Sequence, residues 1–185
     1  MAKKHNFVIT NMVASASLGL ELDLFSLAQK IKEIEYEPEQ FPGAILKFKE
    51  PKASLLLFKN GKVVCVGCKK RSIIKKTIEK TIKLLTPYAK KIIRKKKPKI
   101  EITNMVASAD LDIDLDLYKI ASELDDVEYE PEQFPGAILK IKEPKASLLL
   151  FKNGKVICAG AKTEEEIDRV LGKAKSLLKK LAKKR

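Results

Sequence analysis

The sequence lacks the residues on which several classes of protein depend. It has no tryptophan, a single histidine (His5) and only three cysteines, Cys65, Cys68 and Cys158. Three cysteines cannot form a fully paired disulfide framework, and one Cys-x-x-Cys pair without a second pair is too small a ligand set for a zinc site. No nucleophile, base and orienting residue fall together in a motif, and no glycine-rich phosphate loop is present. We therefore expect no enzyme, no metal site and no cofactor.

Long apolar runs are also absent. No run reaches the roughly 18 residues that cross a bilayer, and residues 1–6 lack the apolar stretch of a signal peptide. Acidic residues are scarce, since 24 Asp and Glu stand against 38 Lys and Arg, and the formal net charge is +14. These features predict an intracellular protein whose partner is an acidic polymer or a membrane surface.

What the sequence does contain is an internal repeat. Asn11-Met-Val-Ala-Ser recurs from Asn104, and Tyr36-Glu-Pro-Glu-Gln-Phe-Pro-Gly recurs from Tyr129, in both cases 93 positions later. Between residues 35 and 69 only Phe48, Val64, Val66 and Cys68 differ from their counterparts Ile141, Ile157, Ala159 and Ala161. A period this long indicates two half-domains related by a pseudo-dyad. We expect a first repeat over residues 1–97, which ends in a basic connecting helix over residues 69–97, and a second repeat over residues 98–185.

The hydrophobic pattern of each repeat predicts one order of elements. A strand comes first (7–14 and 100–107), then a helix whose apolar residues fall at i, i+3, i+4 and i+7 (24–31 and 117–124). Four short alternating strands follow, at 35–37, 44–49, 54–58 and 62–66 in the first repeat, and a second helix closes each repeat. Pro87 should end or kink the first closing helix, and Thr163 with Glu166 could cap the second. This order favours an α+β fold with helices on one face of an antiparallel sheet.

The other face of the sheet should then be open. Strand parity places Val13, Leu56, Phe58, Val64 and Val66 on that face, and Asn11 with them. Soluble monomers rarely leave so large an apolar patch unused, so we expect a binding surface, or a surface that a partner domain or a second copy covers.

Four phenylalanines recur at matching places in the repeats. Phe41 and Phe134 lie beside a proline at a turn, and Phe58 and Phe151 end the strands that follow. Two interpretations stay open from the pattern alone. The rings could pack in the core, or they could act as apolar wedges that enter a base step from the minor groove of DNA and kink the duplex.

These motifs together resemble the TATA-binding protein family, and its archaeal members in particular. Asn-Met-Val-Ala-Ser, Tyr-Glu-Pro-Glu-Gln-Phe-Pro-Gly, the Glu-Pro-Lys turn, Leu-Leu-Phe before Asn-Gly-Lys-Val, and Gly160-Ala161-Lys162 carry the resemblance over most of the chain. It implies a saddle in which a curved ten-stranded antiparallel sheet binds DNA on its concave side and carries helices on its convex side. It also implies a general transcription initiation factor, nucleoid-associated in the cytoplasm of an archaeon or nuclear in a eukaryote.

The resemblance assigns roles to individual residues. The pairs Phe41 with Phe58 and Phe134 with Phe151 would kink the DNA, and Asn11 and Asn104 would donate to minor-groove acceptors. The apolar floor would consist of Val13, Leu56, Val64, Val106, Leu149 and Ile157. The lysines at matching places in both halves are either phosphate contacts or solvated charges: Lys47, Lys52, Lys62, Lys69, Lys140, Lys145, Lys155 and Lys162.

One departure from the family concerns the centre of the site. Val66 and Ala159 stand where the family commonly has threonine or serine. We therefore predict a more hydrophobic centre with fewer hydrogen bonds and looser discrimination at the central base step.

Partners and direction of binding follow from the same resemblance. Transcription factor B would grip Glu130, Glu132 and Gln133 and so link the chain indirectly to RNA polymerase, but Glu37, Glu39 and Gln40 repeat that sequence. Residues 1–97 hold 22 Lys and Arg against 8 Asp and Glu, whereas residues 98–185 hold 16 of each. We therefore hypothesise that flanking charge, with Lys75, Lys76 and Lys80 set against the acidic run 164–166, determines orientation.

A second class of function stays open. The saddle could serve as a protein-interaction module without sequence-selective DNA binding, its open face closed by a partner chain. The free protein could also cover that face by forming a homodimer.

Overall fold

The computed structural model describes residues 5–93 and 97–182, which fall into two compact units. The N-terminal unit comprises residues 11–103, and the C-terminal unit comprises residues 104–182 with residues 5–10. Both boundaries, after Thr10 and after Thr103, fall inside strands. The sequence repeats and the compact units therefore divide the chain at slightly different places.

The elements of the first repeat follow the predicted order, with two further short strands, one after the first strand and one after the closing helix. They are β1 (Phe7–Ser17), β2 (Leu20–Glu21), α1 (Leu24–Lys30), β3 (Ile34–Glu35), β4 (Ala44–Phe48), β5 (Ala53–Leu57), β6 (Lys62–Cys68), α2 (Arg71–Leu85), a 3-10 turn (Thr86–Tyr88) and β7 (Lys91–Ile92). The second repeat contains β8 (Ile100–Asp110), α3 (Leu117–Glu123), β9 (Val127–Glu128), β10 (Ala137–Ile141), β11 (Ala146–Leu150), β12 (Lys155–Ala161) and α4 (Glu164–Lys179).

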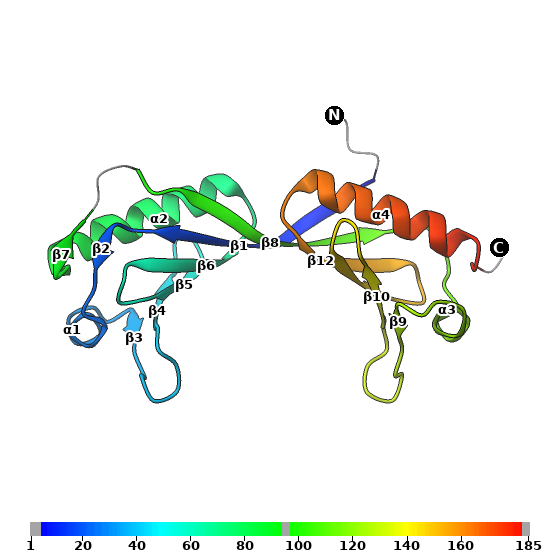
Figure 1. The fold of residues 1–185 in the computed structure, drawn as a ribbon, viewed down its shortest axis with the longest axis horizontal. Helices are drawn as coiled ribbons and strands as arrows, with labels where there is room; N and C mark the ends of the chain where they lie inside the picture. Colours follow the sequence, from blue (N-terminus) through cyan, green and yellow to red (C-terminus); the bar gives the residue numbers. More distant parts are fainter. Residues whose placement is uncertain (1–4, 94–96, 183–185) are drawn as a thin grey trace. The chain divides into compact units, whose positions relative to one another are not determined.

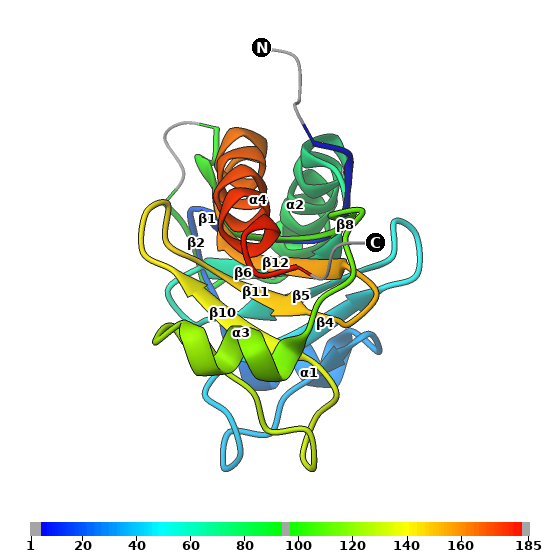
Figure 2. The same ribbon diagram turned by 90° about the vertical axis from the view of Figure 1, so that its right-hand side faces the viewer.

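The main sheet has ten strands in the order β3-β4-β5-β6-β1-β8-β12-β11-β10-β9. Pairing within each unit is antiparallel, as in β4 with β5 and β10 with β11. The predicted α+β class and ten-stranded antiparallel sheet are therefore confirmed. In each unit the long helix, α2 or α4, covers one face of the strands, and the loops before β4 and β10 project from the opposite side (Figures 1 and 2).

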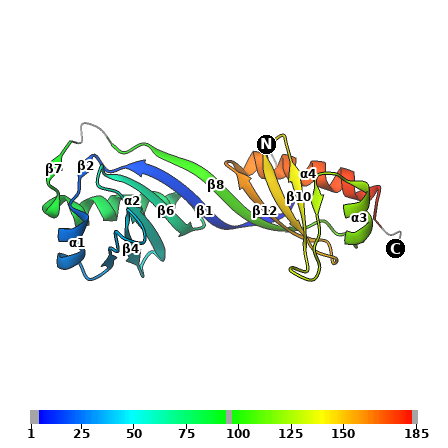
Figure 3. The same cartoon turned by 60° about the horizontal axis from the view of Figure 1, so that its bottom comes forward.

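The core of each unit lies between the strands and the long helix. Along β5 and β6 the buried residues Leu55, Leu57, Val63 and Cys65 alternate with half-buried or exposed ones, which leaves the other face of the strands open (Figure 3). The helix stripe opposite them is buried and consists of Ile74, Ile78, Ile82 and Leu85 in α2, and of Ile167, Val170, Leu171, Ala174 and Leu178 in α4.

The basic segment 69–97 is less helical than the sequence predicts. Helix α2 ends at Leu85, and Pro87 lies in the 3-10 turn that follows, in agreement with its predicted role. Beyond it the chain forms β7, which pairs with β2 in a separate two-stranded sheet. The prediction of a connecting helix as far as residue 97 was wrong, and residues 94–96 lie outside the described part of the chain.

Candidate nucleic-acid interface

The open face of the N-terminal unit is a row of side chains that crosses five strands. Residues directly opposite each other in antiparallel strands point to the same face. Glu35 lies opposite Ile45, and the row continues through Leu56, Val64 and Ser15. The apolar members of this row are half-buried, so they are accessible to a ligand laid on the strands.

The C-terminal unit repeats this row. Its members are Glu128, Ile138, Leu149, Ile157 and Ser108. Ile157 is 37% exposed, which is high for a large aliphatic side chain in a sheet. Two units with the same row present the same apolar surface twice.

A second row in each unit contains Val66 or Ala159, the two residues that the resemblance marks as departures. Lys47 lies opposite Ser54, which lies opposite Val66. In the C-terminal unit the row runs from Lys140 through Ser147 and Ala159 to Val106. Val66 and Ala159 thus each have a serine as their neighbour on this face, and the open face keeps one hydroxyl beside each departure.

The two predicted asparagines are held by backbone bulges. The pairing of β1 with β6 shifts register between Met12 and Ala14, and Gly67, with φ of 90°, lies at that irregularity. Its N–H donates to Asn11 Oδ1 at 2.9 Å, and the Gly160 N–H donates to Asn104 Oδ1 at 2.7 Å. With Oδ1 engaged, each amide offers its Nδ2 donors to a ligand. Asn11 and Val13 are half-buried, as are Asn104 and Val106.

Each predicted phenylalanine pair comes together at one end of the open face. The Phe41 and Phe58 rings have centroids 6.0 Å apart at 65°, and the Phe134 and Phe151 rings 6.0 Å apart at 66°. Such edge-to-face contacts hold the rings in place without burying them. Phe41 is 38% exposed and Phe134 is 41% exposed. The core-packing interpretation therefore does not hold for Phe41 and Phe134, Phe58 and Phe151 are half-buried, and the wedge interpretation stays a prediction.

Glycines make room for these rings. A Cβ added at Gly43 would lie 2.7 Å from Phe41 Cε1 and 3.2 Å from Phe58 Cε1. At Gly136 it would lie 2.7 Å from Phe134 Cε1 and 3.3 Å from Phe151 Cε1. Because real Cβ atoms do not approach carbon this closely, a larger residue would displace the rings.

The loops before β4 and β10 form matching turns, which we call the stirrup loops (residues 36–43 and 129–136). The Glu37 carbonyl accepts from the N–H groups of Gln40 and Phe41, and the Glu130 carbonyl accepts from those of Gln133 and Phe134, all at 3.0 Å. The predicted partner contacts Glu130, Glu132 and Gln133 are exposed, and so are their counterparts in the first stirrup loop.

The predicted phosphate-binding lysines are exposed in both units. Lys47 and Lys140 form ion pairs with Glu35 and Glu128. The remaining positions are Lys52, Lys62, Lys69, Lys145, Lys155 and Lys162, all exposed.

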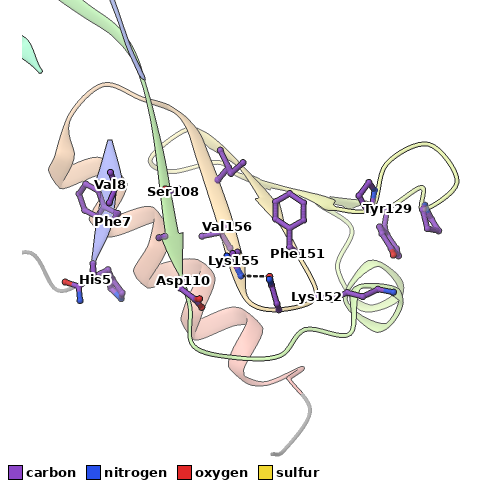
Figure 4. Close-up of a pocket in the computed structure, with 16 residues that line it drawn as sticks. His5, Phe7, Val8, Ser108, Asp110, Tyr129, Phe151, Lys152, Lys155 and Val156 are labelled. Atoms are coloured by element: carbon purple, nitrogen blue, oxygen red, sulfur yellow. Dashed lines mark hydrogen bonds between the residues drawn. The ribbon is translucent and has the colours of Figure 1, made fainter. Parts of the chain in front are cut away.

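A cavity in the C-terminal unit adjoins the open face. Its volume is about 1110 Å³, and Phe151 and Tyr129 line one end while His5 and Phe7 line the other (Figure 4). The Asp168 carboxylate holds His5 by accepting from its backbone N–H at 2.9 Å and lying 3.1 Å from its ring Nδ1. Lys155 also lines the cavity, so this space is continuous with the candidate interface.

Comparison with known proteins decides the family. The family model described as "Transcription factor TFIID (or TATA-binding protein, TBP)" matches residues 6–88 and 99–181. The chain belongs to the TATA-binding protein family.

Several archaeal TATA-binding proteins are similar over nearly the full length. The TATA-box-binding protein of Picrophilus torridus is 45% identical over 183 residues, 98% of each chain, and that of Archaeoglobus fulgidus is 39% identical over 175 residues, 94% of each. The solved structure of Methanococcus jannaschii TBP matches with a TM-score of 0.85 and 41% identity, covering 95% of this chain and 99% of that one. The TATA-binding protein family consists of DNA-binding transcription factors and not of enzymes, as the sequence led us to expect.

Buried thiols lie in the cores of both units. Cys65 and Cys158 are buried, as predicted, and burial raises the pKa of the Cys65 thiol to about 12 and that of Cys158 to about 11. Within residues 5–93 and 97–182, no cluster of His, Cys, Asp and Glu could hold a metal ion. In the same residues, no helix is long and apolar enough to cross a membrane.

Sequence reasoning missed part of the open face. Ile45, Ile138, Ser15 and Ser108 lie in the two apolar rows. The alternation of buried and open residues along β4, where Ile45 and Lys47 share a face, was the signal that could have found the isoleucines. Glu35 and Glu128 share that face as well, but only the strand register reveals it.

Proposed function

We propose that this chain is a general transcription initiation factor that binds the minor groove of A/T-rich TATA-box DNA and kinks it with its paired phenylalanines. In this proposal it recruits transcription factor B and, through it, RNA polymerase. The observation that carries the proposal is the duplicated open face, an apolar row in each unit together with a phenylalanine pair of which one ring, Phe41 or Phe134, is exposed.

An apolar face selects A/T-rich sequence by exclusion. The guanine amino group projects into the minor groove, and an apolar floor such as Leu56 and Val64 would bury it without a hydrogen-bond partner. Adenine N3 and thymine O2 are acceptors, which the Nδ2 groups of Asn11 and Asn104 can satisfy. Because both acceptors are equivalent in this groove, the proposed recognition distinguishes A·T from G·C pairs but not A·T from T·A pairs.

The phenylalanine pairs supply the proposed kinks. Apolar wedges that enter a base step unstack it at a cost of a few kcal/mol, and the bent duplex then covers more protein surface; the TATA-binding protein family is itself the standard example of this energetic exchange. The exposure of Phe41 and Phe134, and the glycines that seat them, support this role.

The centre of the proposed site should discriminate less than its ends. Val66 and Ala159 offer no hydroxyl, so a central base substitution should cost less than in a homologue with threonine at both places. A set of duplexes that vary only at the central step measures this cost. Equal costs in the two proteins would contradict the proposal.

Orientation on the promoter is proposed to come from outside the stirrup loops. Their sequences and turns are the same in both units, so a partner that reads only a stirrup loop cannot tell the ends apart. Of the three lysines hypothesised to contribute, Lys80 is already engaged, since its Nζ donates to the Glu50 carbonyl and lies 4.5 Å from the Phe48 ring centroid. Lys75 and Lys76 are the better candidates, and their reversal to glutamate should change orientation with transcription factor B bound.

The decisive experiment is a titration of two end-labelled duplexes, one with a TATA-like site and one scrambled. Anisotropy reports binding, and energy transfer between the ends reports bending. We expect tight binding and end-to-end shortening on the TATA-like duplex alone. Equal, steeply salt-dependent binding without shortening would overturn the proposal and direct the search to a protein that covers the open face.

A further inference from the structure

An acidic side chain lies on the open face of each unit, where a DNA-binding surface should be positive. In the N-terminal unit Glu35 lies opposite Ile45, on the same face as Lys47. The Lys47 ammonium contacts both carboxylate oxygens of Glu35, at 2.9 Å and 3.0 Å. A lysine proposed to contact phosphate is thus already paired with an anion of its own chain.

The C-terminal unit builds the same pair. Lys140 Nζ donates to Glu128 Oε1, and Glu128 lies opposite Ile138 as Glu35 lies opposite Ile45. The side-chain exposures agree as well, at 55% for the lysine and 62% for the glutamate in both units. The Lys–Glu ion pair is therefore a feature of the open face in both units.

The lysine of each ion pair can readily exchange its carboxylate partner for a DNA phosphate. An exposed ion pair between long side chains contributes little to stability, so a phosphate can replace the carboxylate at small cost. In the free protein, however, the carboxylate neutralises the lysine and repels phosphate. We infer that the carboxylates of Glu35 and Glu128 compete with DNA phosphates for Lys47 and Lys140. This competition weakens the phosphate contacts and lowers the salt dependence of DNA binding. This inference rests on the proposed function, and it adds two positioning residues to that site.

The test replaces each glutamate with its neutral isostere. Binding of Glu35→Gln, Glu128→Gln and the double variant to the TATA-like duplex is measured over a range of salt. Each single variant should bind about threefold tighter near 0.1 M salt, and the double variant about tenfold tighter. The slope of log affinity against log salt should steepen by about 0.9 for each lysine released to a phosphate.

A matched control separates this effect from a change in net charge. Glu79 is exposed on α2, so Glu79→Gln removes the same charge away from the open face. It should leave affinity and salt slope unchanged. Tighter binding of Glu79→Gln by the same factor would overturn the inference, and so would an unchanged salt slope in both open-face variants.

A double-mutant cycle tests whether the glutamate acts through the lysine. In a Lys47→Met background, Glu35→Gln should lose most of its effect, and the cycle with Lys140→Met and Glu128→Gln repeats the test in the other unit. A glutamine effect that persists without the lysine would show direct repulsion of DNA and refute the positioning role. Thermal unfolding of every variant checks that it is folded.

The two proposals fail in different ways. If the wild-type chain does not prefer the TATA-like duplex, both the proposed function and the inference about the glutamates are wrong. If the wild-type chain binds and bends that duplex while the glutamine variants behave as it does, only the inference about the glutamates is refuted.

Discussion

The two repeats agree on their open faces and differ on their helices. From residue 35 to residue 69 the sequence differs from its counterpart at only four positions, and the phenylalanine pairs have the same ring geometry. The long helices begin with opposite charge: α2 with Arg71, and α4 with Glu164, Glu165 and Glu166 in its first turn. The ligand of the open face therefore meets the same chemistry twice, whereas a ligand of the helices meets two different surfaces. The proposed function therefore assigns base recognition to the face that agrees, and we propose that the helices, which differ, discriminate between the two ends.

The largest effect is expected from removing one phenylalanine pair at a time. Phe41→Ala with Phe58→Ala should weaken binding to the TATA-like duplex roughly 100-fold, because stacking and wedge contacts contribute about 1–3 kcal/mol per ring. Phe134→Ala with Phe151→Ala should cost the same. Energy transfer between the duplex ends should fall in both variants. A large loss from one pair and none from the other would break the equivalence of the two open faces.

The glycines that seat the rings provide a second comparison. Gly43→Ala and Gly136→Ala each place a Cβ 2.7 Å from a phenylalanine ring carbon, so each should lower the free energy of unfolding by about 1–3 kcal/mol through overpacking. Urea unfolding measures this loss, and near-ultraviolet circular dichroism monitors the aromatic environment. Variants as stable as the wild type would mean that the rings move aside freely and are not held for a ligand.

Much of this comparison could be predicted from the sequence, because strand alternation fixes which residues share a face. It placed Val13, Leu56 and Val64 on the open face and Cys65 in the core. It could not give β7, whose two residues form a strand only by pairing with β2 far away in the chain. Nor could it give the bulge at Gly67, which turns both Cys65 and Cys68 inward and brings their sulfurs to 3.8 Å.

The ion pairs on the open face were also out of reach of the sequence. Lys47 and Glu35 are 12 residues apart, and their contact depends on the register of β3 with β4. The N-terminal cap of α4, in contrast, could be predicted in part from the sequence. Thr163 accepts from the Glu166 N–H at 3.1 Å as predicted, while the Glu166 carboxylate accepts from the Lys162 N–H, one residue before the place a capping box gives it.

The buried thiols allow the pH dependence of stability to be compared between the two cores. Burial raises the pKa of Cys65 from 9.0 to about 12, so the unfolded chain loses this proton first. The contribution of this thiol to the free energy of unfolding is fully present below pH 9. It declines as the pH rises toward 12, by about 1.4 kcal/mol per pH unit. Cys65→Ala should therefore flatten the fall in unfolding free energy between pH 9 and 11, measured by urea unfolding under reducing conditions.

Cys68 provides the matched control for this pH dependence. Cys68→Ala reproduces the Cys158 and Ala161 arrangement of the C-terminal unit, and it removes a neighbour that raises the pKa of Cys65. The decline should then end at a lower pH, closer to that of Cys158, whose pKa burial raises to about 11. Identical pH profiles for the wild type, Cys65→Ala and Cys68→Ala would contradict this account.

The smallest effect concerns the helix starts, where the repeats differ most. Thr163 caps α4, whereas the Lys70 side chain at the start of α2 makes no capping hydrogen bond within the described residues. Positive charge at a helix N-terminus also opposes the helix dipole. Thr163→Ala should lower the free energy of unfolding by about 1 kcal/mol, and Lys70→Thr should raise it by somewhat less. If Lys70→Thr stabilises the fold but leaves orientation on a promoter unchanged, the basic start of α2 does not discriminate the two ends, and Lys75 and Lys76 would have to do so alone.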